Sequence, residues 1–234
     1  MKIVKLLAVM VVGALLYQGG RALLESPALR LKHFDVEGNT ESRVSTRQVV
    51  RASGVEVGDQ LVAISTEQVA ARLQKLPWVQ EARVERILPS TLRISISERM
   101  PDLVVETGQG RFLVDRDGLV LQEGSAPLIV LRDLPLNAVV PGVRIGTPEF
   151  TSAARILHSL PSDVASRVAS VSAPSIDQIR IETRGGPVIY YGAAEQMEEK
   201  NYAAETLLKT GSQQAAGIAV IDVRVPSRPS TRAG

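Results

Sequence analysis

Residues 75–101 read KLPWVQEARVERILPSTLRISISERMP, and this stretch decides the fold of the first half of the chain. Apolar residues alternate with charged or polar ones on both sides of the turn signal Pro89-Ser90, which predicts a hairpin with one apolar and one polar face. Pro77 ends a preceding helix pattern, and Trp78, the single tryptophan of the chain, follows it directly. We expect its indole to pack at the corner between the helix and the hairpin.

The residues before this stretch supply the other elements of a small α+β unit. Phe34 and Val36 alternate with acidic residues before a Gly-Asn turn, which predicts a short strand. Ser45 and Ser65 each precede a glutamine by three residues, the spacing of a capping box, and each opens an apolar helical pattern. The order over residues 34–99 is strand, helix, helix, strand, strand, which predicts a three-stranded sheet with two helices on one side.

The polar face of the predicted hairpin is the part of this unit that is available for contacts. The apolar residues of the hairpin are needed for the core. The polar residues that alternate with them therefore point to solvent. We expect four residues to face outward: Arg83, Glu85, Arg93 and Ser95. They form a weak candidate for a partner-binding surface.

From residue 102 the pattern changes to a second, β-rich unit with two helices. A hairpin is predicted around Asp117-Gly118, where two apolar runs meet a turn signal. Further strands are predicted at residues 127–135, 168–172, 177–192 and 217–225, and the helices at residues 147–160 and 194–210. The sequence therefore predicts a mixed α and β domain that follows the first unit along the chain.

The N-terminal segment is strongly apolar and admits two interpretations. Twelve uncharged, mostly apolar residues lie from Leu6 to Tyr17. Twelve helical residues span only about 18 Å, which is too short for a bilayer and favours a cleaved signal peptide. The run from Ile3 to Leu24 is long enough if its charged residues reach the two interfaces, which favours an uncleaved anchor. Both interpretations export the chain from about residue 25 onward.

Composition and motif content argue against several classes of function. The 27 basic residues nearly balance the 25 acidic ones, so no nucleic-acid-binding field is expected. The chain has no cysteine, which excludes disulfides and thiolate metal sites. His33 and His158 lack a metal-ligand partner at helical spacing, no serine lies in a nucleophile motif, and Lys200 is expected to be a solvated helix lysine. We therefore expect no catalytic residue, metal, cofactor or small-molecule substrate, and a binding or scaffold role.

A set of motifs in a fixed order resembles the bacterial cell-division FtsQ/DivIB family. The motifs are FDVEGNT, LPWVQEARVERILPSTLRISISERMP, LVDRDGLV, ILHSLP and a closing IDVRVPSRP, behind one hydrophobic segment. The similarity covers nearly the whole chain after residue 30. The run from Pro77 to Pro101 is characteristic of the POTRA module of this family.

The resemblance implies a single-pass protein of the cytoplasmic membrane, with its N-terminus inside and most of the chain outside, at the division septum. The implied segments are a cytoplasmic tail (1–5), a transmembrane signal anchor (6–24), a linker (25–32), a POTRA domain (33–101), an FtsQ-type β domain (102–226) and a flexible tail (227–234). Family members are not enzymes. They bridge FtsB-like and FtsL-like division proteins and other divisome membrane proteins, and help to control septal peptidoglycan synthesis.

The resemblance also implies a partner-binding edge, because in this family an FtsB-like protein adds a strand beside the last strand of the second domain. Carried over to this sequence, the contact residues are Val223, Arg224, Val225 and Ser227. Pro226 and Pro229 lack N–H donors, so we expect the added strand to stop near Val225. From the residues alone, the alternative is an edge strand that proline merely protects against aggregation.

Two other functions fit parts of the sequence. A secreted enzyme would have a cleaved signal peptide, a mature N-terminus near Leu23 and hydrolytic activity. A POTRA-bearing transport component would need a long series of alternating β-barrel segments, which this sequence does not contain.

Overall fold

The computed structural model describes residues 26–38, 43–211 and 217–233, which divide into two compact units. Unit 1 ends at Arg99 and unit 2 begins at Met100. The predicted membrane anchor at residues 6–24 lies outside the described residues. Among the helices within the described ranges, none has the length and apolar character needed to cross a bilayer.

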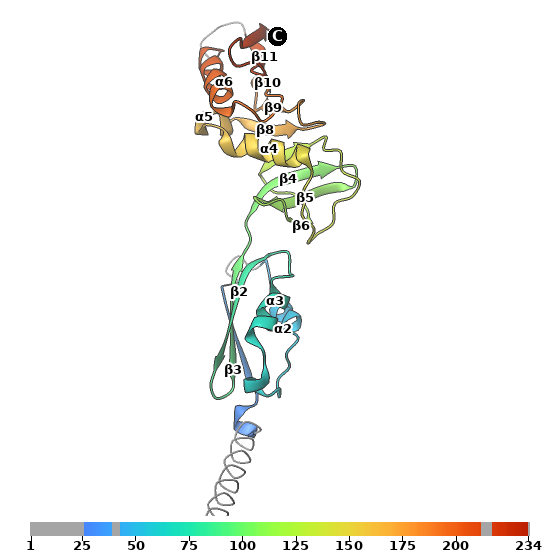
Figure 1. The fold of residues 1–234 in the computed structure, drawn as a ribbon, viewed down its shortest axis with the longest axis vertical. Coiled ribbons are helices and arrows are strands. Elements are labelled where there is room, and N and C mark those ends of the chain that lie inside the picture. Colours follow the sequence, from blue (N-terminus) through green and yellow to red (C-terminus); the bar gives the residue numbers. More distant parts are fainter. Residues whose placement is uncertain (1–25, 39–42, 212–216, 234) are drawn as a thin grey trace, which may run out of the picture. The chain divides into compact units, whose positions relative to one another are not determined.

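Unit 1 is a three-stranded sheet in the order β1-β3-β2, with its two α-helices on one face (Figure 1). Its elements are η1 (Pro27–Leu29), β1 (His33–Glu37), α2 (Thr46–Ser53), η2 (Leu61–Ala63), α3 (Thr66–Leu73), β2 (Val79–Ile87) and β3 (Thr91–Glu98). β1 runs parallel to β3, whereas β2 and β3 form the antiparallel hairpin. The predicted order of strand, helix, helix, strand, strand is confirmed.

A capping box at the N-terminus and a glycine at the C-terminus set the limits of α2, and the spacing of Ser45 and Gln48 predicts the first of these. The Ser45 Oγ accepts a hydrogen bond from the backbone N–H of Gln48 at 3.3 Å, and the Gln48 side chain accepts one from the Ser45 N–H at 2.9 Å. The helix ends at Gly54, whose φ of 65° lies in the left-handed region that glycine adopts without strain. Local chemistry therefore fixes where this helix begins and ends.

Trp78 packs at the corner between α3 and β2, as expected. Its side chain is 8% exposed, and the guanidinium of Arg43 lies 4.7 Å from the ring centroid. The backbone N–H of Arg99 donates to the Trp78 carbonyl at 2.8 Å, which ties the end of the hairpin to the same corner. The tryptophan thus packs in the core of unit 1, on the side of the sheet opposite its outward face.

Unit 2 is built on a nine-stranded sheet in the order β12-β11-β10-β9-β8-β7-β4-β5-β6. Its strands are β4 (Pro101–Thr107), β5 (Gly110–Asp115), β6 (Val120–Glu123), β7 (Ile129–Arg132), β8 (Val168–Ser172), β9 (Arg180–Thr183), β10 (Val188–Tyr190), β11 (Ile218–Asp222) and β12 (Ser230–Ala233). Its helices are α4 (Pro148–Ser159), α5 (Ser162–Ala165) and α6 (Met197–Gly211). The two predicted helices are present as α4 and α6, whereas the one-turn helix α5 was not predicted.

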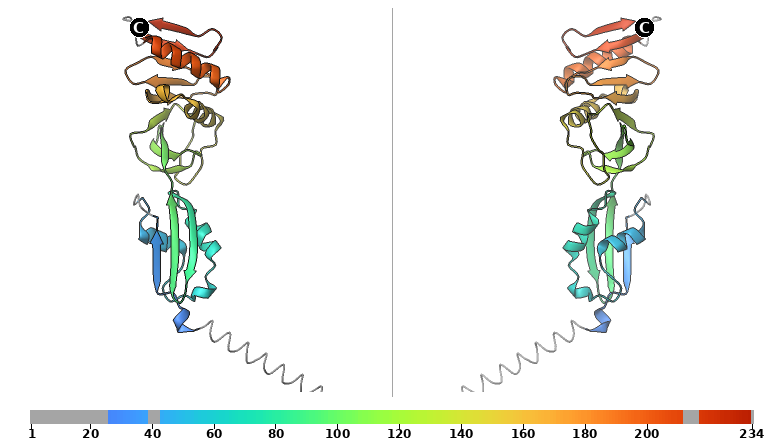
Figure 2. Two further views of the ribbon diagram at one scale, coloured as in Figure 1. Left: turned by 90° about the vertical axis from the view of Figure 1, so that its left-hand side faces the viewer. Right: turned by 90° about the vertical axis from the view of Figure 1, so that its right-hand side faces the viewer.

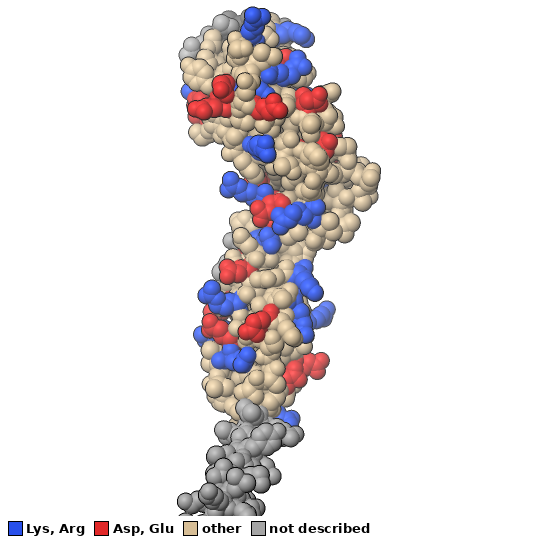
Figure 3. All heavy atoms as spheres, viewed as in Figure 1, with Lys and Arg blue, Asp and Glu red and all other residues tan. Residues whose placement is uncertain are grey.

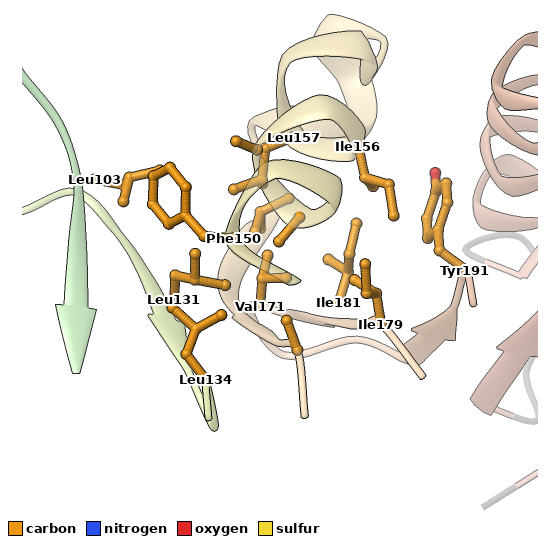
Figure 4. Close-up of a cluster of buried hydrophobic side chains, with 14 of the residues drawn as sticks. Leu103, Leu131, Leu134, Phe150, Ile156, Leu157, Val171, Ile179, Ile181 and Tyr191 are labelled. Carbon is orange, nitrogen blue, oxygen red and sulfur yellow. The ribbon is translucent and has the colours of Figure 1, made fainter. Parts of the chain in front are cut away.

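The core of unit 2 lies between α4 and the middle of the sheet (Figure 4). The α4 residues Phe150, Ile156 and Leu157 pack against branched residues from the strands. The strand residues include Leu131, Val171 and Ile181. Gly118, in the β5–β6 turn, has a φ of 83°. A Cβ there would lie 2.8 Å from the Phe150 ring, so only glycine fits the turn beneath α4.

The C-terminal residues correct the prediction of a flexible tail at 227–234. Ser230–Ala233 forms β12, which pairs antiparallel with β11 at the end of the sheet (Figure 2). β11 ends at Asp222, three residues before the predicted end of that strand, because the chain turns there. The Arg228 N–H donates to the Val225 carbonyl at 3.0 Å within this turn, and the chain then runs back along β11.

Candidate partner-binding site

The strand at the outer end of the large sheet is β12, and it forms the edge next to the C-terminus. Its register with β11 places Thr231 opposite Ile221 and Arg232 opposite Val220. The side chains of Ser230–Ala233 are all exposed, and none of these residues is proline. Because an edge strand has unpaired N–H and C=O groups on its outer side, β12 can hydrogen-bond to an added strand.

The four residues predicted to bind a partner do not form one continuous strand. Val223 is fully buried, and its backbone N–H donates to the Tyr190 carbonyl of β10 at 3.0 Å, so its side chain belongs to the core. Arg224, Val225 and Ser227 lie in the exposed turn that connects β11 to β12. Three of the four are therefore together at the surface, beside the edge strand rather than in it.

Asp222 and Arg224 hold this turn in one conformation. The Asp222 carboxylate accepts hydrogen bonds from the backbone N–H and the Nε of Arg224, both at 3.0 Å, and from its Nη2 at 2.6 Å. The guanidinium also lies 5.7 Å from the ring centroid of Tyr190. A carboxylate that bonds the N–H two residues ahead favours a turn, which explains why β11 stops at Asp222.

These hydrogen bonds predict an acid-sensitive turn. The hydrogen bonds from the Arg224 side chain lower the pKa of Asp222 below its ordinary value of 3.8. A carboxyl with a lowered pKa in the folded chain stabilises the fold above its unfolded pKa, and this contribution disappears as pH falls through the folded pKa. We expect Asp222→Asn to be less stable than the parent at neutral pH and equal to it in strong acid. Thermal unfolding across that pH range checks this, and a stability difference that stays constant with pH would contradict it.

An apolar groove lies beside the turn, between it and α6. Its volume is about 720 Å³, and it is lined by Glu198, Glu199, Tyr202, Ala203, Thr206 and Leu207 of α6 and by Pro226 and Pro229 of the turn. The Tyr202 side chain is 74% exposed, and Val225, next to Pro226, is 57% exposed. Large exposed apolar side chains around one groove are typical of an interaction surface. Pro229 directly precedes β12, so the groove and the edge strand are continuous along the chain.

The residues predicted to face outward from unit 1 do share one face of its sheet. Arg83 pairs across the strands with Ser95, and Glu85 with Arg93. The Arg93 Nε lies 2.9 Å from a carboxylate oxygen of Asp35, so this face is laced with opposite charges. Side chains of both signs are interspersed on the face of the molecule drawn in Figure 3. Exposed ion pairs contribute little to stability. The charged side chains of this face can therefore pair with a partner's charges instead, at little cost to the fold.

Two buried polar side chains of unit 2 have structural partners. Lys200, predicted to be solvated, is 3% exposed, and its Nζ donates to the carbonyls of Tyr191 at 2.9 Å and Ala193 at 2.7 Å. Removal from water lowers the pKa of Lys200, while burial raises the pKa of Tyr191. The Tyr191 hydroxyl donates to the Asn201 side chain at 3.2 Å. These hydrogen bonds join α6 to the end of β10.

Other chemistry-bearing residues also have ordinary roles. His158 is exposed on α4, and its Nε2 lies 2.8 Å from a carboxylate oxygen of Asp102. Within residues 26–38, 43–211 and 217–233, no group of three or more histidine, aspartate or glutamate side chains could hold a metal ion. In the described part of the chain, the end of unit 2 with β12, the turn and the groove is the strongest candidate for a functional site.

Two family models match the chain in tandem. The FtsQ-type POTRA domain model matches residues 29–99, and the model of the cell division protein FtsQ/DivIB C-terminal domain matches residues 103–224. The first match covers most of the described part of unit 1, and the second covers unit 2 up to the turn that contains Arg224.

Similar proteins of known name agree with these models. The chain is 35% identical over 190 residues to the cell division protein FtsQ of Mycolicibacterium smegmatis, covering 81% of the chain and 55% of that relative. It is 33% identical over 214 residues to FtsQ of Mycobacterium tuberculosis, covering 91% and 64%. With FtsQ of Streptomyces coelicolor the identity is 32% over 216 residues, covering 86% and 79%. The chain thus spans 55% to 64% of the length of these two mycobacterial relatives.

Proposed function

Because this chain belongs to the FtsQ/DivIB family of cell division proteins, we propose that it is a non-catalytic scaffold of the division machinery. Its N-terminal apolar segment anchors it in the cytoplasmic membrane as a single pass, with residues from about 25 onward outside. There it bridges FtsB-like and FtsL-like partners and other divisome membrane proteins, and through them helps to control septal peptidoglycan synthesis.

The observation that carries this proposal is the edge strand β12 beside an apolar groove. An extended segment of an FtsB-like partner adds to β12 through backbone hydrogen bonds. The prolines at 226 and 229 do not limit this contact, because both precede the strand. The added strand therefore runs along residues 230–233, and the turn residues Arg224, Val225 and Ser227 contact the partner at one end of it.

The groove gives the contact its side-chain specificity. An apolar side chain of the partner fits between the two prolines of the turn and the α6 residues Tyr202 and Leu207. Glu198 and Glu199 at the rim favour a basic residue next to that apolar one. Backbone pairing supplies the general affinity, and this pocket selects the sequence that binds.

The outward face of unit 1 is proposed as a second, weaker contact region, centred on Arg83, Glu85, Arg93 and Ser95. Its mixed charges suit a partner with an alternating charge pattern rather than an apolar one. This surface uses a different unit from the β12 edge, which is what a bridging scaffold needs. The family match supports the scaffold and gives no support to the secreted enzyme or to the transport component.

Val225→Asp tests the groove contact. We expect about tenfold weaker binding of an FtsB-like partner, equal to about 1.4 kcal/mol, because a carboxylate next to Pro226 of the groove disfavours an apolar ligand. The measurement is the dissociation constant for the partner's extracytoplasmic segment. Since Val225 is 57% exposed, the fold should be unchanged.

Val143→Asp is the matched control for this experiment. Val143 is 56% exposed and lies in the loop before α4, at the other end of the sheet from β12. We expect the control to bind like the parent. Unchanged affinity of Val225→Asp, or an equal loss in both variants, would sink the assignment of the groove.

A further inference from the structure

We propose that the end of unit 1 that carries residues 26–33 docks on the membrane surface. In this arrangement the loop at Val57 and the β2–β3 turn at Leu88 lie in the lipid headgroup region. The inference rests on the membrane anchor of the proposed function and adds to it a lipid-binding surface on the first folded unit.

The exposed large apolar side chains of unit 1 gather at this one end. Leu88 is 64% exposed, Val57 is 65% exposed and Ile87 is 38% exposed. Among the described residues of unit 1, these three are all of its exposed large apolar side chains. Single exposed apolar residues are common, but a cluster of them at one end of a unit indicates a surface that contacts something apolar.

Backbone hydrogen bonds tie both apolar loops to the start of the described chain. Leu31 donates its N–H to the Asp59 carbonyl and accepts from the Gly58 N–H, both at 2.8 Å. On its other side, the Lys32 N–H donates to the Ser90 carbonyl at 2.8 Å. Figure 1 shows η1 and the turn between β2 and β3 at the same end of the unit.

These loops are bonded to residues that follow the predicted anchor closely in the chain, which points to the lipid surface as what they contact. The predicted anchor ends at Leu24, seven residues before Leu31. Seven residues reach at most about 25 Å when fully extended, and the 3-10 turn η1 shortens this path because it rises only about 2 Å per residue. The headgroup region adds about 5 to 8 Å outside each face of the hydrocarbon core. The end of unit 1 therefore lies within reach of the headgroups, and Pro27 and Ala28 of η1 are exposed as well.

The charges around the loops suit an interfacial position. Arg30, Lys32 and Arg86 are exposed at this end, where their side chains can reach lipid phosphates. Glu56 and Asp59 lie in the Val57 loop, and the Asp59 carboxylate accepts the Glu56 N–H at 2.9 Å. The balance of charge is close to even, so the apolar side chains are the main contact with the membrane.

Spin labels test this arrangement directly, because the chain has no cysteine of its own. The full-length chain is prepared with a single cysteine in place of Leu88, Val57, Val225 or Val12. Each variant is labelled and reconstituted in vesicles of phosphatidylcholine and phosphatidylglycerol in equal parts. Power-saturation EPR then compares the access of oxygen, which concentrates in lipid, with that of a water-soluble nickel complex.

The expected result is a several-fold higher ratio of oxygen to nickel access at L88C and V57C than at the water-exposed control V225C. If L88C and V57C are as accessible to nickel as V225C while V12C is buried in lipid, the docking is overturned and the anchor stands. A water-exposed V12C would overturn both the docking and the proposed membrane location. Leu88 and Val57 are exposed, so these labels should not disturb folding, and circular dichroism of each variant checks this.

Discussion

Thr231→Pro is expected to weaken binding of an FtsB-like partner by about 10- to 100-fold. Val223 donates its N–H to β10, so by strand alternation the backbone groups of Val220 and Asp222 face β12. The β12 residues opposite them are Arg232 and Ser230, which leaves the N–H of Thr231 directed to the open edge.

Proline at 231 removes that donor and leaves a partner carbonyl unsatisfied, which costs about 1 to 3 kcal/mol. Calorimetric titration with the partner segment measures the loss. The matched variant is Arg232→Pro, which removes an N–H that faces β11 instead. We expect it to destabilise the C-terminal hairpin, so that its thermal unfolding changes, whereas Thr231→Pro should unfold like the parent. A Thr231→Pro variant that binds with full affinity would remove the support for strand addition at this edge.

Trp78→Ala is expected to lower the free energy of unfolding of unit 1 by about 3 to 5 kcal/mol. The indole is 8% exposed and carries Arg43 over its ring, so truncation leaves a cavity and removes the surface on which the guanidinium stacks. A loss of this size is a large part of the stability of a small domain. Scanning calorimetry of the chain should show the transition of unit 1 at a lower temperature.

Trp78→Phe is the control, because it keeps an aromatic ring and should cost much less. The transition of unit 2 should not move in either variant, since the two units have separate cores. A loss below about 1 kcal/mol in Trp78→Ala would contradict the assignment of Trp78 as a core residue.

The elements that the sequence predicts correctly are those with local signals. The capping serines at 45 and 65, the alternation over residues 79–98 and the Asp117-Gly118 turn each act within a few residues. Such signals do not depend on distant parts of the chain. For this reason the order of elements in unit 1 and the hairpin of β5 and β6 could be predicted.

The candidate site was only partly predictable, because its geometry depends on contacts between distant residues. The sequence of β12, Ser-Thr-Arg-Ala, has weak strand character and acquires its structure by pairing with β11. A regular strand over residues 217–225 would have Val223 and Val225 on one face. The hydrogen bond from the Arg224 N–H to the Asp222 carboxylate turns the chain between them, so Val223 is buried and Val225 is exposed. The burial of Lys200 likewise depends on two carbonyls in the loop after β10.

Hydrogen exchange of the β12 backbone tests the scaffold proposal most directly. The full chain is exchanged with and without the extracytoplasmic segment of an FtsB-like partner, and peptides over residues 218–233 are followed by mass spectrometry. Strand addition predicts strong new protection within β12 at Thr231, because its outward N–H becomes bonded to the partner. Full binding of the partner with unchanged exchange in this strand would contradict the account.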